Sequence, residues 1–472
     1  MKFVTHHKIA VRDQHTGWGR FTWLALAAFI LSIPDTDTFM AERSSAPSMF
    51  VLIGGATAEE ITRLYIPLVA IGLMLALPFT NWRLKKPVSY YVVIVVLLLI
   101  LGWLAAMDCF QGAGYMSIRS PSFLCIVIIL LSYCCFTSLM ECSNWFPPIL
   151  SGIVMASLLK LVYSVYTFRN TGGVRILGGV ESMQGDGGSL NLQVFVASIS
   201  GLKCVEAIWK ENWKKSGFFL FLNIIFVAGM AASFRRHPIL QMAFICCGAT
   251  LLMYWLVGRL SRGIYFISAA FLPVAFTLAV TVLLIYGPDQ SLDRLSSLTL
   301  AAGENNKMAG SNDTYLDDWR VFPAVIARTP GLGLGFSGNY GVCRVIDNYE
   351  AVRVPLHIGA FELWASGGII GAIFQFTIFV ILPISSIIQL KRKHVWLADM
   401  PLFVVSVLLL LWTGLFPFSA PFYVSPLTCL LLGMGLATLT FKPSLSSSLS
   451  LIKSQNALRR CATDIDFTRL HK

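Results

Sequence analysis

The chain has 472 residues, of which 56% are hydrophobic and only 13% are charged, and its mean hydropathy is +0.71. A soluble domain carries roughly 25% charged residues, so this composition excludes a soluble globular fold. The formal net charge of +12 needs no nucleic-acid partner, because membrane proteins concentrate basic residues in their cytoplasmic loops.

Apolar segments long enough to cross a bilayer follow one another along most of the chain. A membrane helix needs ~20 apolar residues, and lipid leaves a non-barrel chain no other way to satisfy its backbone. We therefore predict an all-α polytopic membrane protein with about twelve transmembrane helices. The predicted spans are 21–34, 61–79, 87–107, 121–140, 146–166, 188–208, 216–234, 238–257, 263–286, 357–390, 398–416 and 421–441. The span 357–390 is too long for one ordinary crossing, which predicts a tilt, a kink or a protruding end.

One connection is far longer than the others. Residues 287–356 form a loop of about 70 residues, begin acidic and become Gly-rich and basic. No internal repeat or linker divides the chain. The predicted organisation is therefore a cytoplasmic N-terminal segment 1–20, a transmembrane domain 21–441 that includes a periplasmic loop 287–356, and a cytoplasmic tail 442–472.

The distribution of basic residues predicts the orientation. With the N-terminus in the cytoplasm, the inner segments hold about 22 of the 36 Lys and Arg residues, as the positive-inside rule expects. Inner positive residues are mostly lysine, whereas outer ones are almost all arginine; Lys307 and the membrane-embedded Lys160 are the exceptions. Because a guanidinium keeps its charge and presents a planar fork to phosphate, this bias predicts an anionic, phosphorylated ligand at the outer face.

Ionisable residues at the membrane boundary are costly, which makes them functional candidates. On the outer face these are Arg169, Arg175, Arg235, Arg236, Arg320, Arg328, Arg344 and Arg353, with His357 at the mouth of the next helix and Glu362 further in. A lone histidine at a helix start also serves as a structural cap. Its imidazole, however, titrates near pH 6.5 and can accept a hydroxyl proton at neutral pH.

Three other features carry less weight. The Gly-rich run 331–335 brings backbone N–H groups close enough to bind an anion, but it lacks the Lys-Ser/Thr of a nucleotide-binding loop. Asp35 and Asp37 have a spacing that is common by chance, so we expect no metal and no other cofactor. Cys109 and Cys343 both fall in outer segments, which leaves a disulfide between them open.

Several short motifs occur in a fixed order on the outer face. They are RILG at 175–178, SFRR at 233–236, DWR at 318–320, TPGLGLGF at 329–336, HIGAFE at 357–362 and GIIG at 368–371. Over roughly 165–375 this pattern resembles the O-antigen ligase and polymerase superfamily. Ile358 stands where the family has Asn or Ser. The stretch ESMQG at 181–185 replaces an Asn-Pro-Asn-like segment, which suggests an unusual donor sugar or acceptor.

The resemblance implies a glycosyltransferase with a GT-C-like architecture in the bacterial inner membrane. It also implies a donor glycan on undecaprenyl diphosphate at the periplasmic face, with an acceptor hydroxyl that displaces the lipid diphosphate. On the matching positions, His357 is the expected base, and Arg175, Arg236 and Arg320 are the expected diphosphate clamp. The supporting candidates are Arg235, Arg328, Arg344, Arg353 and Glu362.

Three functions share these features. The first is a polymerase of lipid-linked repeat units. The second is a ligase that moves the glycan to lipid A-core, and it stays open as the alternative because both enzymes carry the same motifs and only the acceptor differs. A polysaccharide flippase is the third, although transporters place ionisable residues near the midplane and often show two related halves. The expected partners are the lipid-linked oligosaccharide, the growing glycan or lipid A-core acceptor, membrane lipids, a chain-length regulator and a flippase, with no nucleic acid.

Overall fold

The computed structural model describes helices and a few short loop segments of the chain. It covers residues 25–30, 69–74, 88–110, 121–140, 146–171, 174–175, 181–182, 187–209, 211–233, 236–257, 319, 322–323, 327, 331–335, 342–346, 349–354, 359–393, 400–415 and 425–440. The predicted N-terminal segment, the predicted span 263–286 and the C-terminal tail lie outside these residues.

Helices occupy the predicted spans that the structure describes. They are α4 (Val88–Phe110), α6 (Pro121–Leu139), α7 (Phe146–Thr171), α8 (Gly187–Trp209), α9 (Trp213–Ala232), α10 (Arg236–Val257), α13 (Gly359–Phe376), α14 (Leu382–Lys393), α15 (Met400–Leu415) and α16 (Pro426–Thr440). Short helical stretches at 25–30 and 69–74 fall within the first two predicted spans. The helical class is thus confirmed.

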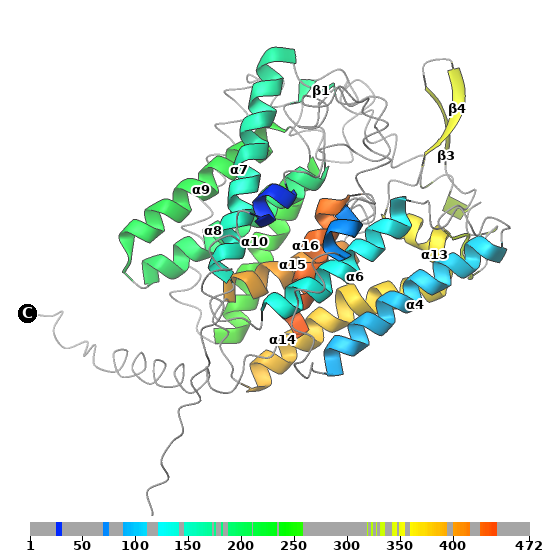
Figure 1. Cartoon of the computed structure of the whole chain (residues 1–472). Helices are drawn as coiled ribbons and strands as arrows, with labels where there is room; N and C mark the ends of the chain where they lie inside the picture. Colours follow the sequence, from blue (N-terminus) through cyan, green and yellow to red (C-terminus); the bar gives the residue numbers. More distant parts are fainter. Residues whose placement is uncertain are drawn as a thin grey trace, which may run out of the picture.

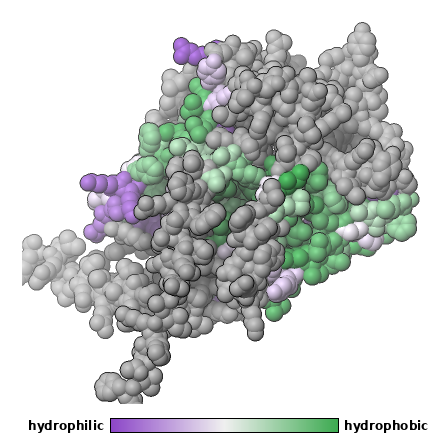
Figure 2. Space-filling model, in the orientation of Figure 1, coloured by the Kyte–Doolittle hydropathy of each residue, from purple (hydrophilic) through white to green (hydrophobic). Residues whose placement is uncertain are grey.

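Five of the described helices are long and apolar enough to cross a membrane. They are Val88–Phe110, Phe146–Tyr166, Ser189–Ile208, Trp213–Ala232 and Leu363–Lys391, and shorter apolar helices accompany them. Figure 2 shows the same property on the surface, where hydrophobic residues cover the middle of the described part and hydrophilic ones gather toward its edges. These helices support a multi-pass membrane protein.

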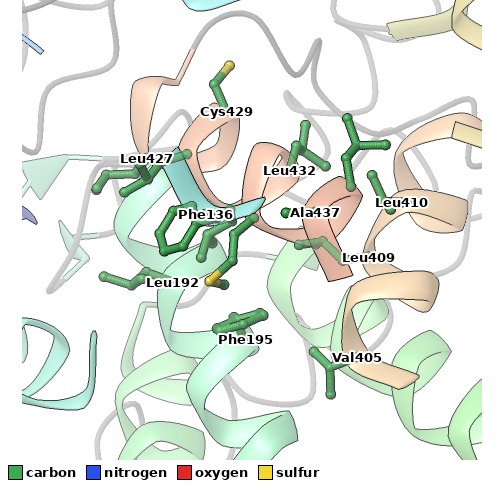
Figure 3. Close-up of a cluster of buried hydrophobic side chains, with 14 of the residues drawn as sticks. Phe136, Leu192, Phe195, Val405, Leu409, Leu410, Leu427, Cys429, Leu432 and Ala437 are labelled. Atoms are coloured by element: carbon green, nitrogen blue, oxygen red, sulfur yellow. The ribbon is translucent and has the colours of Figure 1, made fainter. Parts of the chain in front are cut away.

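The helices form two groups that meet at α8, α15 and α16. Helices α7 to α10 lie together on one side, with α8 packed along α9, whereas α4 runs beside α13 on the other side (Figure 1). Between them α6 packs along α16. The centre is a cluster of buried side chains from α6, α8, α15 and α16, among them Phe136, Phe195, Leu409 and Leu432 (Figure 3).

Small residues and side-chain hydrogen bonds bring these central helices close together. A Cβ added at Gly433 of α16 would meet the Ile129 carbonyl oxygen of α6 at 2.6 Å, so only glycine permits this approach. Ser132 Oγ donates to the Leu430 carbonyl at 2.8 Å across the same contact. In lipid, burial of apolar surface does not favour association of helices, because the lipid tails are equally apolar. Helices there associate through close packing at small residues and through interhelical hydrogen bonds.

The long predicted span 357–390 is a kinked helix, as its length predicted. It consists of α13, a π-helical segment η2 (Thr377–Ile381) and α14, and Gly368 inside α13 has non-helical φ and ψ of 60° and −158°. Near its middle, the side chain of Gln375 is 3% exposed, and neither amide atom has a hydrogen-bond partner in the part of the chain that the structure describes. The span therefore departs from a regular α-helix at two places, at Gly368 and at the π-helical segment η2.

Strands occur only as two short antiparallel hairpins within the described residues. In the first, β1 (Val174–Arg175) pairs with β2 (Glu181–Ser182), between α7 and α8. In the second, β3 (Val342–Ile346) pairs with β4 (Tyr349–Val354), just before α13. Both hairpins lie in segments predicted as outer loops, and the second projects from the helices (Figure 1).

Candidate functional site

The candidate site is organised by a break in α13. At Gly368 the helix backbone leaves helical geometry, so the carbonyls of the preceding turn lose their usual N–H partners. The Gly-rich run supplies replacements: the Leu334 N–H donates to the Ala365 carbonyl and the Gly335 N–H donates to the Ser366 carbonyl, both at 2.8 Å. The turn at 331–335 thus closes the break in the helix.

Two further hydrogen bonds complete this closure. The Ile369 N–H donates to the Gly331 carbonyl at 2.9 Å. From α4, the Trp103 indole N–H donates to the Gly367 carbonyl at 2.8 Å. Because buried backbone groups without partners are costly, above all in a membrane, four satisfied bonds make this an ordered junction of loop, α13 and α4.

Glycine is required at the contact itself. Gly333 has φ of +84°, and a Cβ there would meet the Ser366 carbonyl oxygen, with Gly367 C and Gly368 N at 2.6 Å. A Cβ at Gly368, whose φ is +60°, would meet the Gly331 carbonyl, with Gly331 C at 2.6 Å. The two backbones therefore touch without any intervening side chain.

This geometry corrects one expectation about the Gly-rich run. The run was predicted to bring its N–H groups to an anion. However, the N–H groups of Leu334 and Gly335 are committed to carbonyls of α13. For these two groups the prediction is wrong, and the run acts as a structural turn there.

The segment that carries the DWR motif also reaches the start of α13. The Phe322 ring stacks on the Phe361 ring with centroids 3.7 Å apart, and the Trp319 ring meets Phe361 edge-on at 4.7 Å. Phe361 is buried and directly precedes Glu362 in the chain. Two motif segments that precede α13 in sequence therefore contact the helix at two levels: the segment around 319 contacts Phe361 in its first turn, and the turn 331–335 contacts residues 365–369 around the break.

Asp108 lies at the same junction. Its side chain is fully buried in the last turn of α4, and a Cβ on Gly335 would lie 2.7 Å from its Cγ and 2.7 Å from its backbone nitrogen. The predicted span ended at 107, one residue before it, whereas α4 continues to Phe110. The sequence did contain a signal, because an acidic residue at the end of an apolar run of helix length is unusual. Asp108 was nevertheless left out, because the predicted span ended at residue 107.

The predicted site residues have the following positions. Arg175 lies in β1 at the register position opposite Glu181, Arg236 is the first residue of α10, Arg344 and Arg353 lie in β3 and β4, and Glu362 lies in the first turn of α13. The side chains of these residues, together with His357, Arg235, Arg320 and Arg328, lie outside the described part of the structure, as do Asp35 and Asp37. Their roles remain predictions.

An aromatic contact lies next to the arginine turn 235–236. The ring of His237 stacks on Trp412 of α15 at 5.5 Å between centroids. Phe244, in the third turn of α10, contacts the same indole at 5.4 Å, so Trp412 packs against the N-terminal part of α10. The position of Arg236 is therefore held by an aromatic contact between α10 and α15.

The cysteine at the end of α4 carries a free, exposed thiol. This residue is Cys109, so the disulfide with Cys343 that the sequence left open is not formed. Lys160 of α7, the membrane-embedded lysine, is 5% exposed.

Comparison with protein-family models, curated proteins and solved structures finds no match to this chain.

Proposed function

We propose that the chain is a glycosyltransferase that polymerises undecaprenyl-diphosphate-linked oligosaccharide repeat units into a surface polysaccharide. On this proposal it crosses the bacterial inner membrane about twelve times in a GT-C-like arrangement, with both termini in the cytoplasm and the site at the periplasmic face. It uses no metal. The observation that supports the proposal is that the DWR and Gly-rich segments both contact α13, at Phe361 of the HIGAFE segment and at the break around Gly368.

The proposed reaction joins a sugar to an acceptor hydroxyl. The acceptor oxygen attacks the anomeric carbon, the bond between that carbon and the diphosphate oxygen breaks, and the lipid diphosphate leaves with the bonding electrons. His357 takes the hydroxyl proton as general base. Arg175, Arg236 and Arg320 stabilise the charge that develops on the diphosphate, as fixed cations can do without a metal.

The test is turnover by the purified full-length chain in liposomes with a defined undecaprenyl-diphosphate oligosaccharide. A ladder of longer lipid-linked glycans supports the polymerase. Transfer only to added lipid A-core makes the protein a ligase, which keeps the chemistry and changes the acceptor. Translocation of the glycolipid without any glycosyl transfer overturns the proposal in favour of a flippase.

Two kinds of variant separate the proposed base from the proposed clamp. His357→Ala should retain donor binding and lose ~10²-fold or more in turnover, the range for a general base. Arg320→Lys and Arg175→Lys keep the charge but lose the bidentate fork, so they should weaken donor binding, turnover or both. If His357→Ala retains near wild-type turnover, the histidine is a structural cap and Glu362 becomes the next candidate for the base.

A further inference from the structure

The tryptophan of the DWR motif presents a large part of its ring to the surroundings. Trp319 is 53% exposed, although it contacts Phe361 of α13, which is only 7% exposed. The two ring planes are 89° apart, with centroids 4.7 Å from each other. A perpendicular neighbour can cover at most one face of the indole. The exposed fraction and this contact together leave an aromatic face open to a ligand.

The ring that supports Trp319 is itself fixed. Phe322 stacks on Phe361 with centroids 3.7 Å apart and planes 9° apart. Because Trp319 and Phe322 are three residues apart in the chain, both contacts hold the same short segment against α13. A tryptophan has only two side-chain torsions, so a ring held in this way loses little conformational entropy when a ligand packs on it. Trp319 thus has the rigidity of a preformed binding surface.

The level of Trp319 along α13 is the border of the membrane. The stretch of membrane length begins at Leu363, two residues after Phe361. Within that stretch the exposed apolar side chains begin at Ile369, eight residues after Phe361, which is about 12 Å along a helix. The surface that faces lipid tails therefore begins well below Phe361. Trp319, which contacts Phe361, lies at the level of the lipid headgroups.

A lipid-linked glycan places its parts at matching levels. The polyprenyl chain lies among the lipid tails, the diphosphate lies among the headgroups, and the first sugars follow directly outside the diphosphate. The face of an aromatic ring is electron-rich, so it attracts the C–H groups of a pyranose and disfavours an anion. The exposed indole therefore fits a sugar ring and does not fit the diphosphate.

We propose that Trp319 is a stacking platform for a pyranose ring of the lipid-linked glycan. It packs on C–H groups of the sugar, takes no part in proton transfer, and favours the glycan over the bare lipid diphosphate. The identity of the lipid carrier rests on the proposed function, whereas recognition of a sugar does not require that the chain transfers it. Tryptophan also anchors proteins at membrane interfaces, and that role gives no preference for a glycan.

The test compares two substitutions that differ in aromatic character. Trp319→Phe keeps an aromatic face, whereas Trp319→Leu keeps an apolar side chain without one. Both should fold, because substitutions of exposed side chains usually have small effects on stability, and thermal unfolding in detergent checks this. The control is Trp213→Leu, which removes another exposed tryptophan, at the start of α9.

Affinity is measured with the purified full-length chain in nanodiscs for two probes, an undecaprenyl-diphosphate oligosaccharide and undecaprenyl diphosphate without sugar. We expect Trp319→Leu to bind the glycolipid about 3- to 10-fold more weakly, the range for loss of one aromatic stacking contact. Trp319→Phe should retain more of the affinity than Trp319→Leu. Neither variant should change the affinity for undecaprenyl diphosphate, and Trp213→Leu should change neither affinity.

Three results would overturn the platform. They are a wild-type chain that binds both probes equally, a Trp319→Leu variant that binds the glycolipid like wild type, and equal weakening of both probes, which would make Trp319 a membrane anchor or a packing residue. Failure of the proposed function has a different signature. A wild-type chain that prefers the glycolipid through Trp319 but transfers no sugar would refute the glycosyltransferase and leave the sugar platform in place.

Discussion

Replacement of Gly333 by alanine tests whether the Gly-rich turn holds the break in α13 together. The added Cβ would overlap the backbone of residues 366–368, with Gly367 C at 2.6 Å, where carbon atoms normally remain ~3.5 Å or more apart. The turn must therefore move by about 1 Å away from α13. That shift breaks the hydrogen bonds from Leu334 and Gly335 to the helix.

The magnitude follows from two contributions. A non-glycine residue at φ of +84° costs about 1–2 kcal/mol. Each of the two lost hydrogen bonds adds about 1–2 kcal/mol, because the Ala365 and Ser366 carbonyls stay buried without partners. Gly333→Ala should therefore destabilise the protein by about 3–6 kcal/mol.

Gly331 provides a matched control in the same turn. Its φ is +87°, but among the described residues a Cβ there would have only Ile369 Cγ2 within 4 Å, at 4.0 Å. Gly331→Ala should therefore destabilise the protein only through backbone strain, by about 1–2 kcal/mol. Both variants would be unfolded thermally and with denaturant in detergent, and product formation would be measured beside them. Equal losses for the two alanine variants would refute the steric argument and the role of the turn.

Further predictions concern the junction, the topology and the metal. Trp103→Phe should cost about 1–3 kcal/mol of stability, because it removes the 2.8 Å bond to the Gly367 carbonyl; Trp103→Phe that melts like wild type would contradict this. Cysteine labelling should reach the loop 287–356 only from outside the cell and both termini only from the cytoplasm, and the reverse pattern would remove every site assignment. Activity should survive EDTA; loss that Mg²⁺ or Mn²⁺ restores would instead promote Asp35 and Asp37 to metal ligands.

The helices could be predicted from sequence because their signal is local. In lipid, an apolar run of membrane length can satisfy its backbone hydrogen bonds only as a helix, unless it belongs to a β-barrel. The described helices follow the predicted runs. Their ends differ by a few residues for local reasons. Asn212 caps α9 by accepting the Lys215 N–H, so the helix begins at Trp213 instead of the predicted 216. In α16 the helix begins at Pro426, a residue that is common in the first turn of helices.

The junction at α13 could not be predicted, because it depends on contacts between distant segments. The sequence shows glycines at 331, 333, 335 and 367–368, but not that the first set supplies hydrogen bonds to the helix around the second. The bond from Trp103 joins residues 264 positions apart. Asp108 was missed because the predicted span ended one residue before it, and its burial became evident only from the packed turn.

The hydrogen bonds between α13 and the turn 331–335 give a structural reason for the interruption of α13 at Gly368. A continuous α13 would satisfy its own backbone and would need nothing from the long loop. The break instead leaves three successive carbonyls, at Ala365, Ser366 and Gly367, which bind the Gly-rich turn and Trp103. A shift of the loop by one residue against α13 would put a leucine side chain where Gly333 makes backbone contact, so the glycines exclude that register. On the proposed function, the break lies in the helix that follows the proposed base His357, so transfer should depend on glycines that touch no substrate.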